Sequence, residues 1–427
     1  MRFAQALADL ESRQPERMVP DLSRITAIVE LLDDPQLTYP TIHVTGTNGK
    51  TTTARLVTSL ACAHGLRAGT YLSPHLHSVT ERIGICGEDV SEEEFAETYE
   101  HLLPILRTVD ARGERVTYFE VLTALAFLWF ADKPVSLGVF EVGMGGTWDA
   151  TNLVAGDVAI LCPISLDHPE LGSTVAEVAT EKAGIVKPGK IVVSRTQPPD
   201  AFAVIRDRCR EYEARLLVEG EDFAVRSRRQ AVGGQLVSVR GLHAAYDDLL
   251  LPLFGEHAAG SAAAAIVALE AFLERPLSDE LLRAALAATT SPGRLEVVDR
   301  HPLVILDGAH NPAGAEALAA ALREAFAWER LHLVIAVSAN KDVGGIVRTL
   351  APLADRAYAT RNTSSRSGPA EGVAAALTDA GVLPEVFDSV AEAIAAARDS
   401  AGPADLILAT GSLYTVADAR RALREEP

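Results

Sequence analysis

The stretch Val44-Thr45-Gly46-Thr47-Asn48-Gly49-Lys50-Thr51-Thr52 follows an apolar run at 41–44 and opens an apolar-periodic segment at 54–60. This order predicts a strand, a tight glycine turn and a helix start, the setting in which a loop can wrap a polyphosphate. The full Walker pattern has a glycine where Val44 stands, so the motif is a shortened Gly-x-x-Gly-Lys-Thr form. We interpret it as a nucleotide-binding loop. A turn that merely carries a lysine is the alternative.

The residue types of this loop suit phosphate chemistry. Gly46 and Gly49 let backbone N–H groups approach the phosphates. Lys50 can reach the terminal phosphate oxygens, and the Thr51 hydroxyl can ligate Mg²⁺. The loop therefore predicts a nucleotide with Mg²⁺ as its ligand.

Length and composition limit the class of protein. A chain of 427 residues is long for one hydrophobic core and predicts two domains. No stretch approaches the ~20 apolar residues of a membrane span, and the N-terminus lacks an apolar signal core. A formal charge of −19 opposes nucleic acid as a partner, because phosphate backbones require a basic surface. We expect a cytoplasmic protein with no membrane or nucleic-acid partner.

The four cysteines are widely separated and form no Cys-x-x-Cys pair. They are Cys62, Cys86, Cys162 and Cys209. This spacing predicts small buried hydrophobic residues in a reducing compartment.

Runs of strand type alternate with helical runs, such as 91–107 and 118–130, through the first half of the chain. The strand candidates occupy 41–45, 68–72, 137–142, 158–163 and 190–194. Such alternation predicts a mostly parallel sheet with helices on both faces. The stretch 216–252 has short alternating pieces instead, which predict a small antiparallel sheet before an alanine-rich helix at 258–272.

A polar turn containing Pro and Gly at 288–294 marks a domain boundary. Beyond it, strand candidates at 303–306, 331–337 and 404–409 alternate with helices again. We therefore predict an α/β chain of two domains. They are a P-loop NTPase-like, mostly parallel sheet domain at 1–293 and a smaller Rossmann-like domain at 294–427.

Polar side chains follow several predicted strands of the first domain. Glu141 precedes a glycine-rich turn and is placed to hold Mg²⁺ directly or through water. Ser73 and His168 follow two other strands, so the same sheet edge would bring them near the phosphate loop. A solvated strand-end glutamate and a surface histidine are the plain alternatives. Lys182, near the end of a helix, would by itself be a C-terminal helix cap.

The second domain has polar strand ends of its own. Asp307 and His310 follow the strand candidate 303–306, and Ser412 follows 404–409. The first two could be turn formers only, and a helix N-cap explains Ser412 equally well. A second polar loop that faces the first domain nevertheless predicts a cleft between domains, where small-molecule sites commonly lie.

A series of ordered motifs, from about residue 40 to Gly411-Ser412, resembles the folylpolyglutamate synthase/dihydrofolate synthase family of the Mur ligase superfamily. The motifs are Gly46-Thr47-Asn48-Gly49-Lys50, Leu72-Ser73-Pro74-His75-Leu76, Thr80-Glu81-Arg82-Ile83, Thr117-Tyr118-Phe119-Glu120, Glu141-Val142-Gly143-Met144-Gly145-Gly146, Asp149-Ala150-Thr151-Asn152, Leu166-Asp167-His168, Glu181-Lys182-Ala183-Gly184-Ile185, Pro292-Gly293-Arg294 and Asp307-Gly308-Ala309-His310-Asn311-Pro312.

The resemblance implies an ATP-dependent amide ligase, commonly monomeric, that acts on small molecules. In this family a substrate carboxylate attacks the γ-phosphate of ATP to give an acyl phosphate. The amino group of L-glutamate then displaces phosphate. The acceptor would be dihydropteroate or a folyl-glutamate. The carboxylate and the triphosphate are both anions, so their approach requires Mg²⁺ and lysine to neutralise charge.

The resemblance also implies two Mg²⁺ sites. Thr51, Ser73 and Glu141 would hold one ion, and Glu141, His168 and Lys182 a second. Lys182 would be carbamylated, which turns a cation into a carboxylate-like ligand.

Further roles follow from the same resemblance. The catalytic residues would be Lys50, His168, Lys182 and His310. The nucleotide would be bound by Thr47, Asn48, Gly49, Lys50, Thr51, Thr52, Arg294, Asp307 and His310. The substrates would contact Phe119, Asp149 and Ala150 on the pterin side and Ser412 on the glutamate side.

The departures from the family pattern include three substitutions around the adenine and substrate positions. Thr147 replaces an arginine, Ala258 a glutamine and Ser261 an asparagine. They motivate one alternative, a divergent paralogue that joins an amino acid to a different carboxylate. A non-catalytic nucleotide-binding protein is a second alternative, which the retained metal and phosphate residues disfavour.

Overall fold

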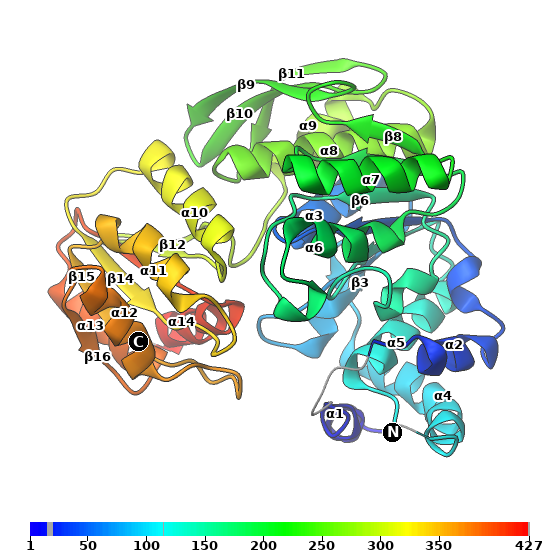
Figure 1. Ribbon diagram of the computed structural model, residues 1–427, viewed down its shortest axis with the longest axis horizontal. Helices are drawn as coiled ribbons and strands as arrows, with labels where there is room; N and C mark the ends of the chain where they lie inside the picture. The colour runs from blue at the N-terminus through cyan, green and yellow to red at the C-terminus, as the bar shows by residue number, and fades with distance from the viewer. Residues whose placement is uncertain (15–19, 114, 426–427) are drawn as a thin grey trace. The chain divides into compact units, whose positions relative to one another are not determined.

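The computed structural model describes residues 1–14, 20–113 and 115–425 and separates into two compact units. Unit 1 comprises Met1–Arg228, Val237–Leu250 and Gly260–Thr289. Unit 2 comprises Arg229–Leu236, Leu251–Ala259 and Thr290–Pro427. Each unit contains a largely parallel sheet with helices packed against it (Figure 1). The predicted α/β fold class is confirmed.

An eight-stranded sheet lies in unit 1, in the order β4-β3-β2-β5-β1-β6-β7-β8. Strands β2, β5, β1, β6, β7 and β8 are parallel, whereas β3 and β4 continue the sheet antiparallel at one edge. Every residue of β1 and β5 is buried, as expected where helices cover both faces. The strands are β1 (Thr41–Thr45), β2 (Ala68–Tyr71), β3 (Ile83–Ile85), β4 (Glu88–Asp89), β5 (Leu137–Glu141), β6 (Val158–Leu161), β7 (Ile191–Ser194) and β8 (Arg215–Val218).

Helices cover this sheet, and α6 and α7 pack against each other (Figure 1). The α-helices before residue 290 are α1 (Phe3–Glu11), α2 (Ser23–Glu30), α3 (Lys50–Ala63), α4 (Glu92–Asp110), α5 (Tyr118–Asp132), α6 (Val175–Lys182), α7 (Pro199–Glu211), α8 (Glu256–Leu273) and α9 (Asp279–Ala287). Among the described residues, α8 alone has the length and composition of a membrane span, and 78% of it is buried inside the protein.

An aromatic cluster supports the centre of this sheet. Phe140 in β5 packs with Tyr39, Tyr71, Phe127 and Phe130, at ring-centroid distances of 5.3 to 6.4 Å. Such pairs stabilise a core beyond the area they bury. The strand is therefore held firmly up to its last residue, Glu141.

A six-stranded sheet, β12-β13-β17-β14-β15-β16, lies in unit 2. Its strands are parallel except β12, which pairs antiparallel with β13. The strands are β12 (Glu296–Arg300), β13 (Leu303–Leu306), β14 (Leu331–Ile335), β15 (Arg356–Ala359), β16 (Pro384–Val386) and β17 (Leu406–Thr410). The helices are α10 (Pro312–Ala325), α11 (Val343–Leu350), α12 (Ala370–Asp379), α13 (Val390–Ser400) and α14 (Leu413–Glu425).

The structure corrects the prediction for 216–252. Its first residues belong to β8, which pairs parallel with β7 in the main sheet. A separate three-stranded sheet contains only β9 (Ala224–Ala231), β10 (Gly234–Arg240) and β11 (Ala245–Leu251).

The prediction of four reduced thiols is wrong for two of them. Cys62 and Cys86 form a disulfide, with Cα atoms 5.7 Å apart. Cys62 lies in the last turn of α3, and Cys86 lies in the turn between β3 and β4. The pairing depends on how β3 folds back beside β2, which sequence spacing does not reveal. Cys162 and Cys209 are free and buried, as predicted.

Candidate active site

Four neighbouring strands place the predicted polar loops of unit 1 at one sheet edge. β2, β5, β1 and β6 are consecutive in the sheet and parallel. Their carboxyl ends therefore meet at one edge, the usual ligand-binding edge of such sheets.

The phosphate loop is shaped by close backbone packing. Gly46 has a φ of +143°, and a Cβ there would lie 2.5 Å from the Cβ of Cys162, so the position requires glycine. Thr47 Oγ1 donates to the carbonyl oxygen of Ser165 at 2.9 Å, which ties the phosphate loop to the loop after β6. The Lys50 Nζ donates to the carbonyl oxygens of Gly46 and Thr47, at 3.0 and 3.2 Å. The ammonium group thus lies over the loop whose ligand it would bind.

Glu141 connects three of the predicted metal-site residues. Its Oε1 accepts a hydrogen bond from Thr51 Oγ1 at 2.8 Å, and its Oε2 accepts from the Ser73 backbone N–H at 3.0 Å. The carboxylate is only 1% exposed. Hydroxyl and carboxylate oxygens are the ligands that Mg²⁺ prefers, so the Thr51 hydroxyl and the Glu141 carboxylate fit the ion.

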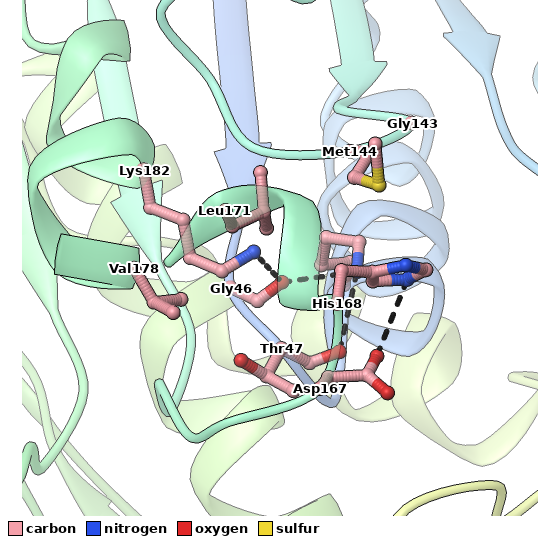
Figure 2. A pocket seen from close by; sticks show the side chains of 10 residues that line it. Gly46, Thr47, Gly143, Met144, Asp167, His168, Leu171, Val178 and Lys182 are labelled. Atoms are coloured by element: carbon pink, nitrogen blue, oxygen red, sulfur yellow. Dashed lines mark hydrogen bonds and ion pairs between the residues drawn. The ribbon is translucent and has the colours of Figure 1, made fainter. Parts of the chain in front are cut away.

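Lys182 is a buried lysine beside the phosphate loop. It is the last residue of α6 and is 4% exposed. Its Nζ donates to the Gly46 carbonyl oxygen at 2.8 Å (Figure 2). Lys50 Nζ donates to the same oxygen, which therefore accepts from two lysines. Burial, and then the neighbouring Lys50 cation, lower the pKa of Lys182 to about 7. A helix-capping lysine would be solvated, so the capping alternative does not describe this residue.

The phosphate loop, Lys50 and Lys182 line a pocket, which Figure 2 shows. His168 extends into it, with Nε2 3.4 Å from Asp167 Oδ2 and Nδ1 3.9 Å from Glu170 Oε2. The lining residues are Gly46, Thr47, Lys50, Gly143, Met144, Asp167, His168, Leu171, Val178 and Lys182. Sequence reasoning did not select Asp167 or Met144, although each stands inside a strand-end motif.

Within the described ranges, no three His, Cys, Asp or Glu side chains gather as a metal-binding group. A metal at this edge would therefore need hydroxyl ligands or a modified lysine beside Glu141.

The residues predicted to contact the acceptor substrate lie around the glycine-rich turn that follows β5. Asp149 is buried and accepts hydrogen bonds from the backbone N–H groups of Met144 and Thr151, at 2.9 and 3.0 Å. Burial raises the pKa of Asp149. The Phe119 ring packs so closely on Gly143 that a Cβ there would lie 2.5 Å from Cζ. Ala150 is buried at the start of the short helix η3 (Ala150–Leu153).

The family-departing residues of unit 1 have local partners. Thr147 donates from its N–H and its Oγ1 to the Glu181 carbonyl oxygen, at 2.9 and 3.1 Å. It thereby joins the glycine-rich turn to the end of α6. Ser261 lies beside the phosphate loop, because a Cβ on Gly49 would be 3.4 Å from its Oγ.

Ala258, the third departure from the family pattern, belongs to unit 2 and is buried. The other residues of the nucleotide loop differ in exposure. Thr47 and Thr52 are buried, whereas Asn48 is half-buried.

Unit 2 brings three predicted nucleotide residues together at the end of β13. Asp307 is buried, and its two oxygens accept from the N–H groups of Leu295 and Ala309, both at 2.8 Å. Burial raises the pKa of Asp307, while the Arg294 cation opposes that rise. The His310 Nδ1 hydrogen-bonds to the carbonyl oxygen of Gly308 at 2.8 Å. All of these partners belong to the same local loops.

Ser412 has the geometry of a helix N-cap, as the alternative interpretation predicted. It is buried, and its Oγ accepts from the Tyr414 N–H at 3.2 Å in the first turn of α14. This geometry explains the residue without a ligand, and its predicted role on the glutamate side stays a prediction.

Two family models match the chain. The Mur ligase middle domain matches residues 44–269, and the Mur ligase glutamate ligase domain matches residues 293–413. Together with the phosphate loop, they define the class of protein as a Mur-type ligase.

Relatives narrow this class. A dihydrofolate synthase/folylpolyglutamate synthase of Mycobacterium tuberculosis is 41% identical over 453 residues, which cover 98% of this chain and 93% of the relative. A Bacillus subtilis protein of the same name is 32% identical, with 95% of each chain covered. The chain therefore belongs to the dihydrofolate synthase/folylpolyglutamate synthase family. It is an ATP-dependent ligase of that type.

Solved structures agree with this assignment. The M. tuberculosis folylpolyglutamate synthase complexed with ADP superposes with a TM-score of 0.95 at 39% identity, covering 100% of this chain and 99% of that one. Escherichia coli FolC in complex with DHPP and ADP gives 0.90 at 30% identity, covering 99% and 98%.

Proposed function

We propose that the chain joins L-glutamate to dihydropteroate, and to folyl-glutamates, with ATP converted to ADP and phosphate. The observation that carries the proposal is the edge cluster of Lys50, Lys182 and Glu141 around one phosphate loop. It combines two amines with a carboxylate and a hydroxyl suited to Mg²⁺. The names of the relatives, and the ADP and DHPP complexes among them, supply the substrate class.

The reaction has two displacements. An acceptor carboxylate oxygen attacks the γ-phosphorus, and the bond between that phosphorus and ADP breaks. The glutamate amine then attacks the acyl carbon, loses a proton, and phosphate leaves. The Lys50 ammonium, now on the Gly46 and Thr47 carbonyl oxygens, would turn to the terminal phosphate. Its charge offsets the repulsion between the two reacting anions.

Two metal positions are part of the proposal. Thr51, Ser73 and Glu141 would hold one Mg²⁺, and Glu141, His168 and Lys182 a second. Mg²⁺, when bound, neutralises charge on the phosphates. An ammonium cannot ligate a cation, so Lys182 would act as its carbamate. The neutral amine adds CO₂ and releases one proton, and the buried position of Lys182 favours that neutral form.

The second unit would complete the enzyme. We assign residues 1–293 to ATP binding and 294–427 to the glutamate ligase domain, which the matches at 44–269 and 293–413 support. Arg294, Asp307 and His310 would contact the nucleotide, and Ser412 the glutamate. Phe119, Asp149 and Ala150 would contact the pterin. We further propose a monomer of the cytoplasm.

The test is ADP formation with ATP, Mg²⁺, L-glutamate and dihydropteroate, with the product identified by mass. Dihydrofolate is the expected product. Turnover with another carboxylic acid but neither pteroate substrate would instead support the divergent paralogue motivated by Thr147, Ala258 and Ser261. Nucleotide binding without turnover on any acid would support the non-catalytic alternative.

A further inference from the structure

A fully buried histidine stands in the middle of β1, the strand that leads into the phosphate loop. His43 is 0% exposed and lies in register between Phe140 of β5 and Ala159 of β6. An aliphatic side chain would fill such a position without the cost of burying polar atoms. The residue therefore needs a reason other than packing.

A chain of hydrogen bonds starts at His43. Its Nε2 lies 2.8 Å from Thr151 Oγ1, and that hydroxyl donates to Asp149 Oδ1 at 2.5 Å. A hydroxyl has one hydrogen, so His43 must donate from Nε2. Burial, followed by the Lys187 charge, lowers the pKa of His43 to about 3, which keeps the ring neutral. In the part of the chain that the structure describes, its Nδ1 is buried without a partner.

This series of hydrogen bonds ends at residues that line the active-site pocket. Asp149 Oδ2 accepts from the Met144 N–H at 2.9 Å. Gly143 and Met144 line the pocket together with Lys50 and Lys182. The strand that carries the phosphate loop is thereby connected, through the side chains of Thr151 and Asp149, to the Gly143–Met144 turn that lines the pocket.

We propose that His43 is a positioning residue for the acceptor: its Nε2–H, through Thr151, orients Asp149 and the Gly143–Met144 turn against the carboxylic acid substrate. This proposal rests on the proposed function, because the acceptor side of the pocket is defined there. His43 itself touches no reacting atom.

The first test is steady-state kinetics of His43→Leu and His43→Gln. The leucine removes the donor, so the KM for the acceptor should rise roughly tenfold, as for one lost hydrogen bond. The KM for ATP should stay close to that of the wild type. Glutamine carries an N–H at a comparable reach and should restore the acceptor KM. Equal effects of both variants, or parallel changes in both KM values, would overturn the proposal.

A matched control comes from unit 2. His332 is also 0% exposed in a central strand, and its ring nitrogens lie 3.1 Å from Tyr358 Oη and 3.2 Å from Asp405 Oδ2. His332 is the second residue of β14 and Asp405 directly precedes β17, so this pair lies at the amino ends of its strands. The loops at His310 and Ser412 follow the carboxyl ends of β13 and β17. His332→Leu should lower the Tm and leave the acceptor KM unchanged.

Amide hydrogen exchange tests the same inference without turnover. The N–H groups of Met144 and Thr151 are bonded to Asp149, so segment 143–151 should exchange faster in His43→Leu than in the wild type or His43→Gln. Equal exchange in all three proteins would overturn the proposal. If the wild type turned over no pteroate substrate, the proposed function would fail, while the exchange result would still decide the role of His43.

Discussion

The carboxyl edges of the two parallel sheets carry similar residue types but bond them differently. In unit 1, Glu141 accepts from Thr51 on α3 and from Ser73 after β2, so elements far apart in sequence meet at one carboxylate. In unit 2, Asp307 accepts only local backbone N–H groups, among the bonds described above, from Leu295 and Ala309. A bond to a hydroxyl can be exchanged for one to a ligand without unfolding a loop, whereas bonds to two buried backbone amides cannot. The first edge is suited to exchange ligands and the second to keep its shape.

The largest effect should come from the phosphate loop of unit 1. Lys50→Ala removes the cation beside the terminal phosphate, and we expect roughly a 10³-fold loss of turnover with little change in Tm. ADP formation at saturating substrate measures it. Lys190→Ala is the control, because Lys190 pairs with Asp157 at the surface, 2.7 Å away. Unchanged turnover in an active Lys50→Ala preparation would refute the phosphate-loop assignment.

Lys182 should give the next largest effect. Lys182→Arg keeps a cation but cannot form a carbamate, so the second metal position loses a ligand. Losing even a residue that supports a metal ligand costs roughly 10- to 100-fold in activity, and we expect a loss at the upper end of that range. Intact-mass analysis of the wild type should find one added carboxyl group, absent from the variant. An unmodified wild type with full activity would contradict the second metal position.

The pH dependence of Lys182 follows from its lowered pKa. In the folded, unmodified chain the pKa is about 7, against an ordinary value of 10.5. The unfolded state therefore binds more protons between these values, and the stability of unmodified protein should rise as pH increases from about 7 to 10.5. Activity should need more dissolved CO₂ below pH 7, where the amine is protonated. Denaturant midpoints measured in CO₂-depleted buffer at two pH values would check the stability. Turnover measured with and without added CO₂ at the same pH values would check the activity.

Glu141 and Asp307 test the comparison directly. Asp307→Ala leaves two buried N–H groups without acceptors and should cost about 2 to 6 kcal/mol of unit 2 stability. Glu141→Ala leaves one backbone N–H, that of Ser73, without its acceptor. This variant should therefore lower Tm less than Asp307→Ala does, but should lose more of the turnover. Thermal unfolding and ADP formation should rank the two variants in opposite orders. The same order in both assays would show that the two edges do not differ in kind.

The disulfide should give the smallest effect on the site. Cys62 and Cys86 are separated by 24 residues, and cross-linking a loop of that length stabilises by about 3 kcal/mol. Cys62→Ser with Cys86→Ser, or a dithiol reductant, should lower the denaturant midpoint of unit 1 and leave turnover at low temperature intact. A midpoint unaffected by reduction would show that the crosslink does not contribute to stability.

The sequence was most informative where function depends on a local pattern. The glycine turn before Lys50 and the strand alternation predicted both the α/β class and the sheet edge at which Glu141, Ser73 and His168 lie. Those signals are short in range, because a strand end and the loop after it are neighbours in the chain.

What sequence reasoning missed depends on contacts between distant segments. In the sequence, His43 is one residue of an apolar strand pattern and gives no sign of a role. Its hydrogen-bond partner Thr151 lies 108 residues away. The link between Cys62 and Cys86 depends on the fold of β3 beside β2. The burial of Lys182 depends on α6 ending against Gly46, whereas its sequence alone describes a helix cap.

One carbonyl oxygen gives the site a further property. Gly46 accepts from both Lys50 and Lys182, so two amines share the space beside the incoming triphosphate. Converting one of them into a carbamate places a negative charge where an amine stood. If Lys182 is modified as proposed, dissolved CO₂ sets the electrostatic potential at the position of the triphosphate. Nucleotide binding then depends on the concentration of CO₂ in the cell.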